Sequence, residues 1–240
     1  LSGVVYNLRA PLVVVDEHFP PELISHIPRG HVLVGPTDHV TPSGHGSPLP
    51  VVEDDSDAIA FIQHSAGTTG LQKGVALSHR QVLNQLANLT QVLRITTKDR
   101  IISWLPLYHD MGLIACFVLP LVCHLQLVMQ SPTQWVLQPA SMLRLASDFR
   151  CTLAWLPNFA FQFMASRVPS GGELGLDLSS MRAFINCSEP VRHDSIVAFH
   201  KRFEGVGLRE SALHTSYAMA EATFAVTQSQ IDGAAWPTVI

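Results

Sequence analysis

Short apolar runs that alternate with amphipathic segments constrain the fold of this chain more than any other feature of its sequence. Most of these runs are continuous and rich in β-branched residues, which is typical of strands buried on both faces. The alternation predicts a layered α/β fold in which mainly parallel β-sheets are flanked by helices. The predicted strands cover residues 12–15, 32–34, 58–62, 101–104, 125–129, 152–156, 182–186 and 213–216.

Three segments between these runs carry helix signals. In residues 78–93, apolar side chains recur at helical spacing, and Ser78 with Gln81 has the sequence of a capping box. Proline is favoured in the first turn of a helix, so we predict two further helices, over residues 139–149 and 190–203.

Composition excludes several classes of function. The chain has 240 residues, enough for a full core, and only 14% of them are charged. A net charge of −4 gives no basic surface, so we expect no nucleic-acid partner. The longest apolar run, residues 111–123, is too short for a transmembrane segment. The four cysteines form no C-x-x-C pair and lie in apolar contexts, which predicts reduced thiols and a cytoplasmic protein.

Residues 65–74, with the sequence SAGTTGLQKG, follow one predicted strand and precede the helix signal at Ser78. Glycines allow backbone N–H groups to approach an anion, hydroxyls add donors, and a lysine adds positive charge. The spacing differs from that of a Walker A loop. We interpret the segment as a phosphate loop of another kind, although an ordinary turn is the alternative. Its candidate binding residues are Ser65, Gly67, Thr68, Thr69, Gly70 and Lys73.

Four further segments complete a pattern. They are SWLPLYHDMG at 103–112, AWLPNFAF at 154–161, NCSEPVR at 186–192 and SYAMAEAT at 216–223. With the loop, they resemble the adenylate-forming superfamily of acyl-CoA synthetases, luciferases and peptide-synthetase adenylation domains. Within it, the chain is most similar to the fatty-acyl-AMP ligases, over residues 58–230.

The resemblance implies ATP and Mg²⁺ as cofactors and assigns roles to three residues. Lys73 would hold the β- and γ-phosphates, Glu221 would bind Mg²⁺, and His109 would lie where the acyl carboxylate meets the α-phosphate. For Glu221, the alternative is a capping carboxylate in the first turn of a helix that begins near Ala220.

The same resemblance places adenine between the Tyr217 ring and the segment 187–190, where Cys187 and Ser188 stand in place of the usual Gly-Ala. The nucleotide-binding residues would be Cys187, Ser188, Glu189, Pro190, Tyr217, Ala218, Met219 and Ala220, together with those of the loop. The acyl chain would contact Met111, Gly112, Asn158 and Phe159, although for each apolar residue taken singly a place in the core is the better interpretation.

The implied function is ATP-dependent activation of a fatty or other carboxylic acid to an acyl-adenylate, in lipid or polyketide biosynthesis. An acyl carrier protein thiol would then accept the acyl group. The alternatives are an acyl-CoA synthetase that uses coenzyme A and a non-catalytic nucleotide-binding module.

Family members are more than twice as long, so we interpret the chain as part of their large N-terminal domain, without the C-terminal domain. We expect a leading segment and connector at 1–57, an α/β lobe at 58–178 and the start of a second lobe at 179–240. By itself, the chain is expected not to complete adenylation.

Overall fold

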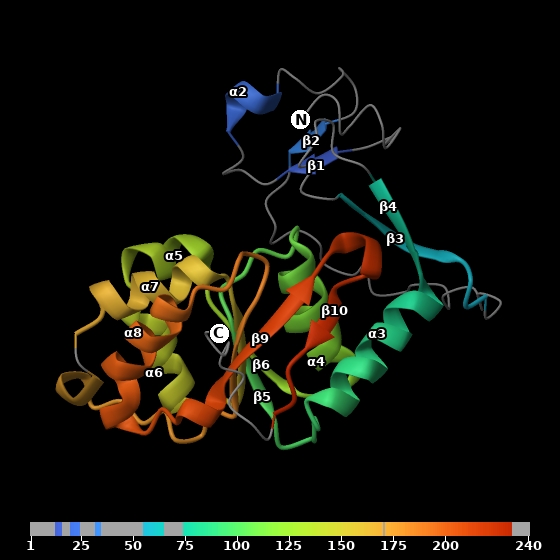
Figure 1. Cartoon of the computed structure of the whole chain (residues 1–240). Helices are drawn as coiled ribbons and strands as arrows, with labels where there is room; N and C mark the ends of the chain where they lie inside the picture. The colour runs from blue at the N-terminus through green and yellow to red at the C-terminus, as the bar shows by residue number, and fades with distance from the viewer. Residues whose placement is uncertain are drawn as a thin grey trace, which may run out of the picture. The chain divides into compact units, whose positions relative to one another are not determined.

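The computed structural model describes residues 13–15, 20–24, 32–34, 55–64, 74–169 and 171–231. Contacts divide the chain into two compact units, residues 1–53 and 54–240 (Figure 1). In the first unit, β1 (Val13–Val15) pairs in parallel with β2 (Val32–Val34), and the short helix α2 covers Pro21–Ile24. Both strands were predicted.

A six-stranded sheet forms the centre of the second unit, with strand order β10-β9-β8-β7-β5-β6. All neighbouring strands are parallel except β9 and β10. This arrangement confirms the layered, mainly parallel α/β fold. The strands are β5 (Arg100–Ser103), β6 (Gln126–Met129), β7 (Leu153–Leu156), β8 (Ala183–Asn186), β9 (Leu213–Ala218) and β10 (Ala225–Gln228).

Helices cover both faces of this sheet (Figure 1). One face carries α3 (His79–Val92) and α4 (Leu119–Val122). The other carries α5 (Pro132–Leu137), α6 (Ala140–Asp148), α7 (Asn158–Arg167) and α8 (His193–Phe203).

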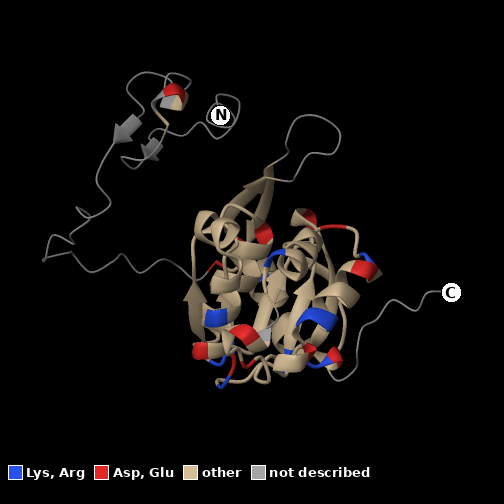
Figure 2. Ribbon diagram, turned by 90° about the vertical axis from the view of Figure 1, so that its left-hand side faces the viewer, with Lys and Arg blue, Asp and Glu red and all other residues tan. Residues whose placement is uncertain are grey.

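The central strands β7 and β8 are buried along their whole length. Most of the ribbon is free of charged residues (Figure 2). None of the described helices is long and apolar enough to cross a membrane.

The predictions of α3 and α6 are confirmed, whereas the predicted start of α8 is wrong. The capping box of α3 is present, because Ser78 Oγ accepts the Gln81 N–H at 3.3 Å and Gln81 Oε1 accepts the Ser78 N–H at 2.8 Å. Helix α6 follows Pro139 as expected. Helix α8 begins at His193 rather than at Pro190, because the preceding backbone is extended and the Arg192 N–H is bonded to a side chain of α7.

The segment before α3 also differs from the prediction. Strand β4 (Gly74–Ser78) lies between the phosphate loop and the helix, and it pairs in antiparallel fashion with β3 (Ile59–His64). The loop therefore joins the two strands of a hairpin, not a strand and a helix. The prediction failed because Ser78 serves two elements, as the last residue of β4 and as the N-cap of α3.

The predicted division at residue 178 stays a prediction. Strands on both sides of that position, β7 and β8, pair within the same sheet, with Leu156 opposite Asn186.

A buried ion pair fastens the amino ends of the central strands. Asp99 is only 2% exposed, and its carboxylate accepts from the Thr96 N–H, from Thr152 Oγ1 and from the Arg182 guanidinium. Burial alone would raise the pKa of Asp99, but these hydrogen bonds outweigh it and hold the pKa below its usual range. Arg182 also donates to the carbonyl of Leu93 at the end of α3.

We expect Asp99→Asn to lower the free energy of unfolding by about 2 kcal/mol at neutral pH, because it removes the charge that Arg182 pairs with. A carboxyl group with a depressed pKa stabilises the fold above its unfolded pKa of about 4, and this contribution is lost as the pH falls further. The difference between wild type and variant should therefore shrink below about pH 4 in denaturant titrations. Asp148→Asn, at an exposed position of α6, is the control and should change little. A difference that stays constant down to pH 2 would contradict the account.

Candidate active site

The predicted site residues that the structure describes lie at one edge of the sheet. Segments 104–110, 157–159, 187–190 and 219–221 directly follow the carboxyl ends of β5, β7, β8 and β9. The strands are parallel, and the pairing of Leu156 with Asn186 keeps the ends of β7 and β8 level. In open α/β sheets, ligands bind at this edge.

Direct hydrogen bonds join three of these segments. Ser188 Oγ lies 3.7 Å from Met111 Sδ, which links the segment after β8 to the residue that directly follows segment 104–110. Glu189 Oε2 accepts the backbone N–H of Phe159 at 2.9 Å, in the first turn of α7. The predicted adenine segment and the predicted acyl segments are therefore in contact.

His109 and Asp110 form a pair at this edge. His109 Nδ1 lies 2.7 Å from Asp110 Oδ1, and the imidazole is 45% exposed. The hydrogen bond to Asp110 raises the pKa of His109, and burial opposes this only in part. His109 therefore keeps its positive charge to higher pH than a free histidine, and it can donate a hydrogen bond to an anion.

The turn that carries His109 depends on a glycine. The His109 N–H donates to Pro106 O at 3.2 Å, and a Cβ at Gly112 would lie 2.3 Å from that same oxygen. Gly112 lies in the π-helical segment Met111–Val118, in which the Leu119 N–H reaches back to Ile114 O. Gly112 thus has a packing role, and its contact with an acyl chain stays a prediction.

The predicted adenine slot has one exposed aromatic face. The Tyr217 ring, at the end of β9, is 60% exposed. Ser188 adopts a positive φ of 69°, which is uncommon for a residue other than glycine. Cys187 is fully buried, and this burial raises the pKa of its thiol, so the thiol stays neutral and belongs to the interior.

Asn158 uses its amide within the protein. Its Oδ1 accepts from Asn186 Nδ2 and from the Arg192 N–H, both at 3.0 Å, and its Nδ2 lies 3.3 Å from Ser195 Oγ. The side chain is buried, so the geometry favours a role in positioning segment 187–190. A direct contact of Asn158 with the acyl chain stays a prediction. Sequence reasoning missed Asn186 as its partner, because the two residues are distant in sequence.

An aromatic cluster lies beside α7. The rings of Trp104 and Trp135 stack at 3.8 Å, and Phe159 meets both edge-on. Phe159 is 47% exposed, so this apolar cluster reaches the surface at the start of α7. Such a surface suits an acyl chain.

Glu221 lies in a single 3₁₀ turn, Ala220–Ala222, instead of the helix that was expected to begin near Ala220. It is exposed, and it has no ion-pair partner among the residues that the structure describes. Mg²⁺ usually binds one or two carboxylates and takes its other ligands from phosphates and water, so a free carboxylate fits this ion. Within the described ranges, no three residues of the His, Cys, Asp and Glu types gather as a ready-made metal site.

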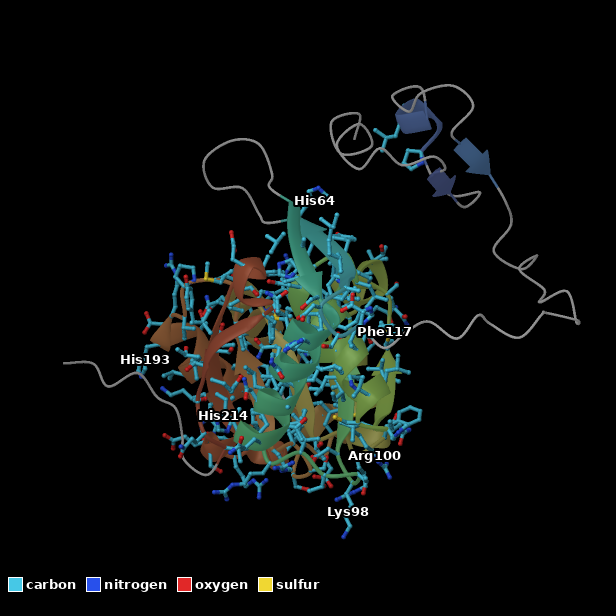
Figure 3. All side chains as sticks on the ribbon, turned by 90° about the vertical axis from the view of Figure 1, so that its right-hand side faces the viewer. His64, Lys98, Arg100, Phe117, His193 and His214 are labelled. Atoms are coloured by element: carbon cyan, nitrogen blue, oxygen red, sulfur yellow. The ribbon has the colours of Figure 1, made fainter. Side chains whose placement is uncertain are left out.

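Residues 65–73 of the predicted phosphate loop lie outside the described residues, among them Ser65, Gly67, Thr68, Thr69, Gly70 and Lys73. His64, which precedes the loop, and Gly74, its last residue, are paired across the β3–β4 hairpin. Figure 3 shows His64 at the opposite end of the unit from Arg100, the first residue of β5. His64, the last described residue before the loop, therefore lies at the end toward which β5 runs, whereas Lys98 lies at the other end.

Comparisons with known proteins identify the family of this chain and several of its relatives. Residues 7–239 match the family model described as AMP-binding enzyme. The chain is 36% identical over 186 residues to the long-chain-fatty-acid–AMP ligase FadD32 of Mycobacterium marinum, covering 75% of this chain and 29% of that protein. It is 32% identical to the medium-chain-fatty-acid–[acyl-carrier-protein] ligase JamA of Moorena producens, covering 72% of this chain and 29% of that protein.

A solved structure shows the same fold. The crystal structure of the fatty acyl-adenylate ligase from L. pneumophila, in complex with acyl adenylate and pyrophosphate, superposes with a TM-score of 0.84 at 29% identity. The superposition covers 97% of this chain and 41% of that one. The chain thus spans less than half the length of these relatives.

Proposed function

The chain belongs to the AMP-binding enzyme family, and we propose that the intact protein activates a fatty acid with ATP to form an acyl-adenylate. The observation that carries this proposal is the convergence of His109, Tyr217 and Glu221 with segment 187–190 at the carboxyl edge of the sheet. The similarity to fatty-acyl-AMP ligases supports a fatty acid as the substrate.

In the proposed reaction, a carboxylate oxygen of the fatty acid attacks the α-phosphorus of ATP. The bond from that phosphorus to the bridging oxygen of the β-phosphate breaks, and pyrophosphate leaves. Both reactants are anions, so the protein must position them and offset the charge that develops on the phosphate oxygens.

Three residues would meet this demand. His109, whose pKa is raised by Asp110, would donate a hydrogen bond where the carboxylate and the α-phosphate meet. Lys73, with the hydroxyls and N–H groups of its loop, would hold the β- and γ-phosphates. Glu221 would hold Mg²⁺, which supplies positive charge next to the phosphates when it is bound.

The rest of the site would bind the two ends of the product. Adenine would stack on the exposed Tyr217 ring, opposite the backbone of residues 187–190. The acyl chain would lie against the apolar surface that Phe159 and the neighbouring tryptophans form.

An acyl carrier protein thiol is the proposed acceptor of the acyl group, because JamA is named for that activity. Coenzyme A is the second candidate, as in the acyl-CoA synthetases. We also propose that the reaction takes place in the cytoplasm and that the described site is completed by parts of the protein outside this chain. The 240-residue chain alone should then form no acyl-adenylate.

ATP–pyrophosphate exchange by the intact protein tests the proposal. We expect exchange that depends on Mg²⁺ and on a medium- or long-chain fatty acid, with no exchange when an amino acid replaces it. Strong exchange with an amino acid and none with any fatty acid would overturn the fatty-acyl assignment.

A further inference from the structure

The turn between β9 and β10 holds a strained residue beside Glu221. Thr223 has φ 71° and ψ −46°, close to the values of the rare and strained γ-turn. A positive φ is an outlier for a β-branched residue, because Cβ crowds the backbone. Such a conformation persists only where the surrounding structure holds it.

Two sets of contacts hold this turn. Within it, the Met219 N–H donates to Phe224 O at 2.8 Å, and the Thr223 N–H donates to Ala220 O at 2.9 Å. From outside, the side-chain amide of Gln85 reaches in from α3. Two backbone carbonyls face this amide, and a carbonyl can only accept, so the amide nitrogen is assigned to the side of the turn. In this orientation it donates to the carbonyls of Ala222 and Ala225, both at 3.0 Å.

The Gln85 amide therefore bridges the strained residue. Ala222 precedes Thr223, and Ala225 follows it by two positions, so the two hydrogen bonds fix the backbone on both sides. Gln85 is only 9% exposed, which protects these bonds from competition by water. Ala222 is also the immediate neighbour of Glu221, so the position of its carbonyl governs the direction of the Glu221 backbone.

We propose that Gln85 is a positioning residue that clamps this strained turn so that Glu221 presents its carboxylate to a phosphate-bound Mg²⁺. The inference rests on the proposed function. Helix α3 begins directly after β4, which follows the phosphate loop, and it runs beside β10 (Figure 1). One helix thus connects the strand after the loop to the turn that carries Glu221.

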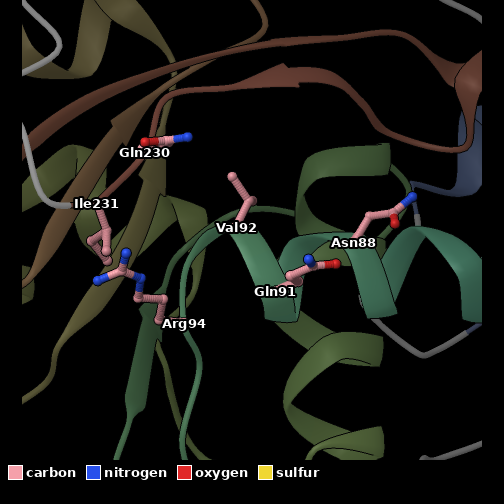
Figure 4. Close-up of a pocket in the computed structure, with 6 residues that line it drawn as sticks. All are labelled: Asn88, Gln91, Val92, Arg94, Gln230 and Ile231. Carbon is pink, nitrogen blue, oxygen red and sulfur yellow. The ribbon is translucent and has the colours of Figure 1, made fainter.

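The same helix offers a matched control. Gln91 lies on the exposed side of α3, where it lines a cavity of about 530 Å³ with Asn88 and Gln230 (Figure 4). Within the described residues, Gln85 and not Gln91 donates to the carbonyls of the turn. Gln85→Met and Gln91→Met are the same chemical change, but only the first removes the two donors to the turn.

The test measures fatty-acid-dependent ATP–pyrophosphate exchange by the intact protein over a range of Mg²⁺ concentrations. We expect Gln85→Met to raise the Mg²⁺ concentration for half-maximal exchange about tenfold, as the loss of a residue that orients a metal ligand does. Gln91→Met should leave it unchanged. Adding Thr223→Gly to Gln85→Met should restore most of the Mg²⁺ response, because glycine adopts the turn without strain. The proposal is overturned if Gln85→Met shifts the Mg²⁺ response no more than Gln91→Met does.

A second measurement separates this proposal from the proposed function. If the wild-type protein shows no exchange with any acid, the proposed function fails, and thermal unfolding of the same variants still tests the clamp. We measure the change in Tm that Thr223→Gly causes in the wild type and in Gln85→Met. The change in the wild type should be more positive by about 2 °C, because the strain is enforced only while Gln85 holds the turn. Equal shifts in both backgrounds would show that Gln85 and Thr223 are not coupled.

Discussion

Glu221→Ala should lower fatty-acid-dependent ATP–pyrophosphate exchange by about 100-fold or more in the intact protein, while the free energy of unfolding changes little. The loss corresponds to about 2.7–4 kcal/mol of transition-state stabilisation, which is typical when an electrostatic stabiliser is removed. The stability effect should be small because Glu221 is exposed and has no ion-pair partner among the described residues.

A glutamate in a similar local structure provides the control for this variant. Glu210 lies exposed in another single 3₁₀ turn, Glu210–Ala212, which precedes β9 and therefore lies at the opposite edge of the sheet. Glu210→Ala should retain full exchange. If Glu221→Ala also retains exchange, with the same Mg²⁺ dependence as the wild type, then Glu221 is only a residue of the turn.

Gly112→Ala should destabilise the protein by about 3 kcal/mol, near the upper end of the range for an overpacked core. The added Cβ would lie 2.3 Å from Pro106 O and 3.0 Å from the Pro106 carbonyl carbon, so the backbone itself must move. The moving segment is the turn that positions His109. Exchange activity should therefore fall by more than the smaller fraction of folded protein accounts for.

Gly172→Ala is the matched control, because nothing lies within 4 Å of a Cβ built at Gly172. Denaturant titration of the two variants measures the difference directly. Equal midpoints for Gly112→Ala and wild type would mean that the turn around Pro106 is free to shift, and the rigid presentation of His109 would then be wrong.

Local patterns allowed much of the fold to be predicted. The buried strands β7 and β8 are continuous apolar runs, and the capping box of α3 is complete within four residues. Strands β4 and β10 were missed because each is partly exposed, so neither is a continuous apolar run. Their pairing with β3 and β9 depends on contacts that periodicity does not show.

The residues of the candidate site likewise fall into those that a local pattern identifies and those that it does not. His109, Tyr217 and Glu221 were identified because each lies in a distinctive short motif. The residues that position them were not, because Gln85 and Asn186 act through partners far away in sequence. A glutamine on a helix has no local feature that predicts a bond to a turn more than a hundred residues later. Only the folded chain shows these contacts.

The transfer of oxygen from the fatty acid to AMP is the most direct test of the account. If the fatty-acid carboxylate attacks the α-phosphorus, one of its oxygens becomes the bridge of the acyl-adenylate. When a thiol then takes the acyl group, that oxygen stays on the phosphate. With a fatty acid labelled with ¹⁸O in its carboxylate, Mg²⁺, ATP and a thiol acceptor, we predict that the intact protein releases AMP carrying one ¹⁸O atom, as read by mass spectrometry. Unlabelled AMP, or label found in inorganic phosphate together with ADP, would contradict the account.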